Sequence, residues 1–452
     1  MQKTHFATFK KIGRVDSLEV VLGKGFRHSA AALLFVIVPL GWMPFVWADD
    51  LKGTLTTLLA QHDRIRAAEG DLAAARDRAK AALGVRYPTL NVTSHYGYEA
   101  QNKFESATTS MPSREIDVKL TQQLWNFGAS SSAIESARLT FKQANENLEM
   151  AKQTLLLEGI SALLDVYLTQ KKLEYAKQSV SNIKLQTELE DARVQEGSGF
   201  SADVLQAKSQ LVDAEALRIK IKEEADVALD RHKTIFGDYP QSKQGSAKLK
   251  IPTQLLPISL SEAIKIAQEN NPRLASSEFG VKLATATVAE TKANELFPSV
   301  NLVSSTKQKV DAAGTKGYQG EYMVKVEVAY DFNFGLSSIR RLQATKQERE
   351  ATARRLREAR DQIEEQVKNK WKGLLTAHEN AGLLVTKTVI AQELLKHTRE
   401  ERDLGRRSLM DVLTQETKLI NTLSEAVAAE TKTVTKAYEL LEAIGRLDVE
   451  WL

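Results

Sequence analysis

The chain of 452 residues has no cysteine and only nine prolines. The lack of cysteine excludes a disulfide framework, a thiolate metal site and a lipid anchor on cysteine. No proline lies between Pro112 and Pro240, and none follows Pro298. Ala, Leu, Glu, Lys, Gln and Arg fill these stretches, and all are good helix formers. The composition therefore predicts very long helices rather than ordinary globular domains.

Residue patterns for catalysis or metal binding are also missing. The seven histidines are scattered, without a His-Glu-x-x-His pair or other ligand spacing, and the chain has no phosphate-binding P-loop. The acidic side chains lie among Lys and Arg, as on solvated helix faces. We therefore expect neither an enzyme nor a bound cofactor or metal.

The N-terminus is typical of a secretory signal peptide over residues 1–48. Lys24 and Arg27 precede an apolar run at residues 30–38, and the small or modest side chains of Val46 and Ala48 stand third and first before a cleavage position after Ala48. A membrane anchor is the alternative, but this run is shorter than the roughly 20 residues a spanning helix needs. Removing residues 1–48 leaves 56 basic and 56 acidic residues. This balance excludes the basic surplus of a nucleic-acid-binding protein.

The rest of the chain repeats itself at an offset close to 208 residues. Four motifs recur in the same order, which predicts a first repeat over residues 49–257 and a second over residues 258–452. The paired segments are residues 62–65 with 271–274, 86–92 with 296–302, 126–128 with 333–335, and 197–205 with 405–413.

Heptad patterns indicate helices packed side by side in both repeats. The first pattern runs through Leu205, Ser209, Val212, Ala216 and Ile219, and the second through Leu413, Thr417, Ile420, Ser424 and Val427. Because both have the same register, we expect both to pack alike. A helix over residues 129–196 would be about 100 Å long. Such a length fits a fibre, a coiled coil or a tunnel wall.

Four segments instead alternate apolar and polar residues, as strands do. They lie near residues 86–101, 114–127, 298–310 and 320–334, and loops 102–113 and 311–317 would join them outside the cell. Apolar residues with aromatics near the ends are typical of the lipid-facing side of a transmembrane β-barrel. A soluble, half-buried sheet is the alternative.

Four strands are too few to close a barrel, which needs about eight. An open sheet edge in lipid would leave backbone groups without hydrogen bonds. The chain is therefore expected to oligomerise. A dimer would supply eight strands and a trimer twelve.

The duplicated order resembles the TolC family of outer-membrane export proteins. The resemblance rests on residues 260–274, on strand entries at Pro88 and Pro298, and on the Asn-Phe-Gly strand exits. It implies a mainly α-helical chain with a transmembrane β part, forming a homotrimer with a twelve-strand β-barrel and a twelve-helix periplasmic α-barrel tunnel. Residues 238–257 and the C-terminus would form a belt around that tunnel.

The resemblance also implies partners. They are a periplasmic membrane-fusion adaptor, an inner-membrane ABC transporter or proton-driven pump, and outer-membrane lipid. Residues 196–205 and 404–413 are most similar to ducts of type I protein secretion. A multidrug or small-molecule efflux duct is the alternative within the class, and a periplasmic coiled-coil adaptor is the alternative outside it.

Two turns, near residues 196–202 and 404–409, are expected at the periplasmic mouth. The resemblance implies adaptor-docking tips at Gly197, Ser198, Gly199, Ser201, Gly405 and Ser408, with Ser201 and Ser408 as helix caps. It assigns the periplasmic gate to Asp411, Arg407, Asp203, Arg402 and Thr414. Arg407 and Asp203 would form an ion pair. Arg402 replaces the family's gating tyrosine, and Thr414 replaces a second aspartate.

Overall fold

A computed structural model describes residues 47–102, 108–197, 200–237, 249, 251–332 and 334–451. The predicted signal peptide lies outside these residues, except for the last two positions. Two compact units divide the chain. The helical-hairpin unit consists of residues 1–59, 156–266 and 367–452, and the sheet unit of residues 60–155 and 267–366.

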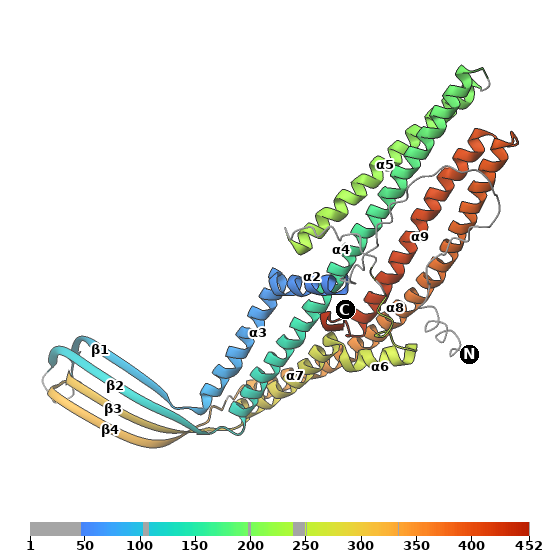
Figure 1. The fold of residues 1–452 in the computed structure, drawn as a ribbon. Helices are drawn as coiled ribbons and strands as arrows, with labels where there is room; N and C mark the ends of the chain where they lie inside the picture. The colour runs from blue at the N-terminus through green and yellow to red at the C-terminus, as the bar shows by residue number, and fades with distance from the viewer. Residues whose placement is uncertain are drawn as a thin grey trace. The chain divides into compact units, whose positions relative to one another are not determined.

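Each repeat contains two shorter helices, two strands and two long helices (Figure 1). The first repeat holds α2 (Trp47–Gln61), α3 (Asp63–Ala82), η1 (Leu83–Arg86), β1 (Thr89–Gln101), β2 (Thr109–Trp125), α4 (Ala129–Gln195) and α5 (Ser201–Phe236). The second holds α6 (Leu260–Asn270), α7 (Pro272–Leu296), β3 (Ser299–Ala312), β4 (Thr315–Ala329), α8 (Ser337–Asp403), α9 (Leu409–Ala443) and η2 (Val449–Trp451). Asn271 caps α7 by accepting hydrogen bonds from the backbone of Arg273 and Leu274.

The strands form one antiparallel sheet in the order β1-β2-β3-β4. Their register places Leu90, Val118, Leu120 and Val326 on one face, where Leu90 is 65% exposed and Val326 62%. Lys307 lies on the other face and pairs with Glu115 and Asp117 at 3.0 and 3.5 Å. One face is thus apolar and uncovered, while the other carries charge pairs. This is the arrangement of a sheet between lipid and water.

The connections at the far end of the sheet are shorter than predicted. β2 begins at Thr109, before the expected start at residue 114, and β3 continues to Ala312. Only Ala313 and Gly314 then separate β3 from β4, and both have positive φ. Left-handed backbone at two successive residues closes a two-residue hairpin, so no long loop is needed there.

The two heptad patterns do not pack alike, which corrects the expectation. Leu413 and Ile420 of α9 are buried, with 0% and 4% exposure. Leu205, Val212 and Ile219 of α5 are 69%, 68% and 61% exposed. Within one chain, α9 packs against α4 and α5, whereas this face of α5 stays exposed among the residues that the structure describes.

No helix among the described residues is both long enough and apolar enough to cross a membrane.

Candidate functional site

The predicted tips are the turns that end the two helical hairpins. Gly197 follows α4 with φ of +80°, and Gly405 follows α8 with φ of +73°. Both glycines therefore adopt the left-handed backbone that ends a helix. After α8, the amides of Gly405 and Arg406 donate to the carbonyls of Arg402 and Glu401 at 2.8 and 2.9 Å.

The two predicted serine caps have different outcomes. Ser408 is confirmed as the N-cap of α9, because its hydroxyl accepts from the Asp411 amide at 3.1 Å and the Asp411 carboxylate accepts from the Ser408 amide at 3.0 Å. Ser201 is wrong as a cap. The extended residue before α5 is Phe200, which has no capping side chain, so Ser201 is already inside the helix. Ser198 and Gly199 lie outside the described residues.

A small apolar cluster holds the hairpins together just behind these tips. Ile183 of α4, Ala207 of α5, and Leu409 and Leu413 of α9 are buried against one another. Leu211, Ala214 and Met410 pack on this cluster. The cluster brings three helices of the two repeats into one packed end.

A buried ion pair joins the hairpins beside this cluster. A guanidinium nitrogen of Arg402, at the end of α8, lies 2.5 Å from a carboxylate oxygen of Glu190 on α4. The two side chains are only 12% and 7% exposed. Arg193 adds a longer contact to Glu190 at 3.5 Å, from a side chain that is half exposed. We call the Arg402–Glu190 contact the Glu190 pair.

A second buried carboxylate connects the same helices. Glu416 of α9 is 4% exposed, and Arg399 of α8 approaches its carboxylate at 2.5 Å. Asn182 of α4 donates a hydrogen bond to the other oxygen of this carboxylate. These three residues form the Glu416 cluster. Neither Glu190 nor Glu416 is among the predicted site residues, because the sequence does not show that a glutamate on a helix is buried. The one indication is that Glu416 is next to Thr417, which lies on the heptad pattern expected to pack against other helices.

Arg407 and Asp203 are not paired in the described part of this chain. Arg407 Nε instead donates to Glu401 at 2.7 Å, from a side chain that is 50% exposed. The hydrogen bonds from Ser408 hold the pKa of Asp411 below its usual range, and Arg407 adds to this effect. A gating role for Arg407, Asp203 and Asp411 stays a prediction.

Thr414 lies apart from these ion pairs, in a shallow polar groove of about 410 Å³ between the hairpins. Gln210 of α5 and Lys387 of α8 line the same groove, with Thr417, Lys418, Asn421, Thr422 and Glu425 of α9. Among the described residues, no group of three His, Asp or Glu side chains could hold a metal ion. The packed end presents two buried carboxylates, Glu190 and Glu416, each paired with an arginine of α8.

Solved structures with this fold are outer-membrane channels. The outer-membrane channel OprN is 19% identical with a TM-score of 0.76, over 88% of this chain and 91% of that one. The CmeC channel of Campylobacter jejuni is 11% identical with a TM-score of 0.76, over 95% and 96%. The predicted fold class, a TolC-type channel-tunnel with helical-barrel and β-barrel parts, is thereby confirmed.

Sequence comparison then identifies the family. The profile of the outer membrane efflux proteins matches residues 54–237 and 263–446, so the chain belongs to the outer membrane efflux protein family. Outer membrane efflux protein BepC of Brucella suis biovar 1 (strain 1330) is 23% identical over 347 residues, 76% of this chain and 75% of BepC. Alkaline protease secretion protein AprF of Pseudomonas aeruginosa is 25% identical over 166 residues, 36% of this chain and 34% of AprF.

The chain is thus an outer-membrane efflux channel of a tripartite system, with a long periplasmic tunnel. The family works with periplasmic adaptors and inner-membrane transporters. Its members and structural neighbours are channels rather than enzymes.

Proposed function

We propose that the chain is the exit duct of a type I protein secretion system, with small-molecule efflux as the alternative. The tip segments at residues 196–205 and 404–413 favour secretion by their resemblance to such ducts, and AprF bears a secretion name. BepC bears an efflux name and matches more of the chain, which favours the alternative. Cargo choice would then belong to an inner-membrane ABC transporter or to a proton-driven pump, respectively.

Deletion of the gene tests the cargo. The secretion duct predicts that specific proteins disappear from the culture medium while drug susceptibility stays unchanged. The efflux duct predicts that drug susceptibility increases while the secreted proteins stay unchanged. Complementation with the wild-type gene controls for effects on neighbouring genes.

We infer that the working duct is a homotrimer of two-repeat chains. β1 and β4 are the edges of the sheet, and each has a row of unpaired backbone groups. The exposed pattern on α5 is the counterpart of the buried one on α9. A neighbouring copy would cover it as α4 and α5 cover α9. The two matches of the family profile support repeats over residues 49–257 and 258–452.

The gate of this duct would be the packed end behind the tips. The observation that carries this proposal is the Glu190 pair, because it joins α8 to α4 while almost excluded from water. Opening by outward movement of one hairpin must separate Arg402 from Glu190, so the pair biases a two-state element toward the closed form. An adaptor docking on Gly197, Gly405 and Ser408 would supply the opposing free energy.

Disulfide cross-linking tests this gate directly, because the chain has no native cysteine. Cysteines replacing Ile183 and Leu413 of the apolar cluster would hold α4 to α9 once oxidised. We expect oxidation to abolish export and reduction to restore it. Export that continues while the cross-link is complete would show that the packed end does not move.

A further inference from the structure

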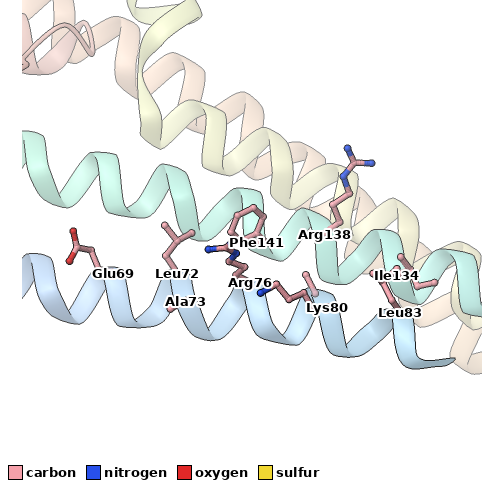
Figure 2. A pocket seen from close by; sticks show the side chains of 10 residues that line it. Glu69, Leu72, Ala73, Arg76, Lys80, Leu83, Ile134, Arg138 and Phe141 are labelled. Atoms are coloured by element: carbon pink, nitrogen blue, oxygen red, sulfur yellow. The ribbon is translucent and has the colours of Figure 1, made fainter. Parts of the chain in front are cut away.

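A second hollow lies in the sheet unit, between α3 and α4 (Figure 2). Its volume is about 710 Å³, and most of its lining is apolar. α3 runs toward the sheet and α4 runs away from it, so the two helices are antiparallel neighbours here. We call this hollow the α3–α4 groove. None of the gate or tip residues lines it.

The lining residues follow one another in tiers along the groove. Figure 2 shows Leu83 and Ile134 at one end, Lys80 and Arg138 next, Arg76 beside Phe141, and then Leu72. Glu69 is the acidic lining residue and lies at the opposite end from Leu83. The groove therefore has an apolar end, a cationic middle and an apolar floor.

Among the described residues, neither Lys80 nor Arg138 forms an ion pair with the opposite helix of the groove. Lys80 contacts Asp77 on its own helix at 3.4 Å, with both side chains more than 60% exposed. Arg138 contacts Glu135 on its own helix at 3.9 Å, again in solvent. Exposed pairs of this kind contribute little, so a bound anion can replace them at small cost.

The other helix pair of the sheet unit is bridged. Arg341 and Arg360 of α8 reach Glu295 and Glu278 of α7 at 2.9 and 2.8 Å. These opposite charges neutralise the α7–α8 contact. The α3–α4 groove, by contrast, has two cations of α3, Arg76 and Lys80, above an apolar lining, and the guanidinium of Arg138 on α4 points away from α3 (Figure 2). Cations gathered along one groove attract an anion.

The apolar end of the groove lies next to the membrane-facing sheet. Leu83 begins η1, and β1 starts at Thr89. Tyr87 and Trp125, 70% and 60% exposed, lie at this end of the strands, where aromatic side chains mark a bilayer interface. From Lys80 to Arg86 the helical chain advances only about 10 Å. The cations thus lie at the depth of lipid headgroups or just beyond them.

We propose that the α3–α4 groove binds a phospholipid with an anionic headgroup, taken from the periplasmic leaflet of the outer membrane. The headgroup phosphate lies beside Arg76 and Lys80, where charge-assisted hydrogen bonds hold it. The acyl chains pass Leu83 and Ile134 on their way into the bilayer. The bound lipid neutralises these two cations and fills the groove between α3 and α4 beside the sheet.

Native mass spectrometry of the detergent-extracted, full-length protein tests binding, with phosphatidylglycerol as the probe and phosphatidylcholine of the same chains as the comparison. We expect phosphatidylglycerol to be retained preferentially. In the double variant Arg76→Gln/Lys80→Gln, affinity should fall at least about tenfold, since a single charge-assisted hydrogen bond to the phosphate contributes on that order. Arg78→Gln is the matched control, because Arg78 is an exposed residue of α3 outside the groove.

A bimane label at Ala79→Cys tests the location, using phosphatidylglycerol brominated on its acyl chains as a quencher. We expect strong quenching at Ala79 and weak quenching at Arg78→Cys. Equal lipid retention by the double variant and wild type would overturn the proposal, as would equal retention of phosphatidylcholine. Displacement of the lipid by millimolar inorganic phosphate would also overturn it, because the groove would then bind a free anion rather than a lipid. Absence of quenching at Ala79 would show that a neighbouring copy fills it.

Discussion

Removal of the arginine from the Glu190 pair should open the channel. In Arg402→Leu, Glu190 would remain 7% exposed in the closed state, and the half-exposed Arg193 would be its remaining ion-pair partner among the described residues. Breaking a buried pair from one side costs about 3–5 kcal/mol, because a charge is left without its partner. Outward movement of the hairpin returns Glu190 to water and relieves that cost. The closed state alone is therefore destabilised.

The lower figure, about 3 kcal/mol, is appropriate because Arg193 offers partial compensation. A free-energy change of 1.4 kcal/mol is a factor of ten, so the ratio of open to closed channels should rise about a hundredfold. Single-channel conductance in planar bilayers measures this ratio as open probability. Glu190→Leu/Arg402→Leu should close the channel again, because an apolar pair replaces the buried charges without leaving one unpaired.

Arg407→Ala is the matched control for this experiment. Its partner Glu401 is 46% exposed, and exposed pairs contribute about 1 kcal/mol at most. Its open probability should therefore rise less than about fivefold. An open probability of Arg402→Leu equal to that of the wild type would refute the reasoning. A larger effect of Arg407→Ala than of Arg402→Leu would do the same and would indicate Arg407, at the family's arginine position, as the gating residue.

Three further predictions concern stability in detergent, measured by circular dichroism. Ser408→Ala should destabilise the second hairpin by about 1 kcal/mol through loss of its N-cap, whereas Ser201→Ala should change little; equal effects would contradict the assigned caps. Burial raises the pKa of Glu442, with Glu439 adding and Lys370 opposing. Because the pKa of Glu442 is higher in the folded than in the unfolded protein, its contribution to stability is fully present below the unfolded-state pKa and is lost as the pH rises through the folded-state pKa. The neutral Gln in Glu442→Gln avoids this loss, so the variant should have a higher melting temperature than the wild type at pH 7 but not at pH 4. A Cβ at Gly159 would lie 2.8 Å from Leu58 Cδ2, so Gly159→Val should lower the free energy of unfolding by about 1–3 kcal/mol. Gly373→Ala is the control and should not destabilise the protein, because its Cβ would lie 3.7 Å from the nearest atom, Cδ of Lys436.

Much of the fold was predictable because its signals are periodic. Alternation along the strands gives each side chain its face, and the observed register keeps Leu90, Leu120 and Val326 together. Helix length followed from the absence of proline, and the capping role of Ser408 from a serine placed just before a long helix. Loop lengths were overestimated, because the left-handed backbone of Ala313 has no sequence signature.

The candidate gate was only partly predictable, because burial depends on partners far apart in the sequence. Arg402 was singled out as a departure from the family pattern. Its partner Glu190 lies 212 residues away, on a helix whose other glutamates are exposed or half-buried. The prediction that the heptad pattern on α5 is buried was wrong for the single chain for the same reason. In the proposed trimer the helix that covers this pattern belongs to a neighbouring copy.

The most direct test of the central claim is the mass of the detergent-extracted protein from separated membranes, by light scattering with the micelle subtracted. Three chains per particle in the outer-membrane fraction would agree with closure of the four-stranded sheets into one barrel. A monomer or dimer in the soluble periplasmic fraction would contradict the lipid-facing sheet and the duct built on it.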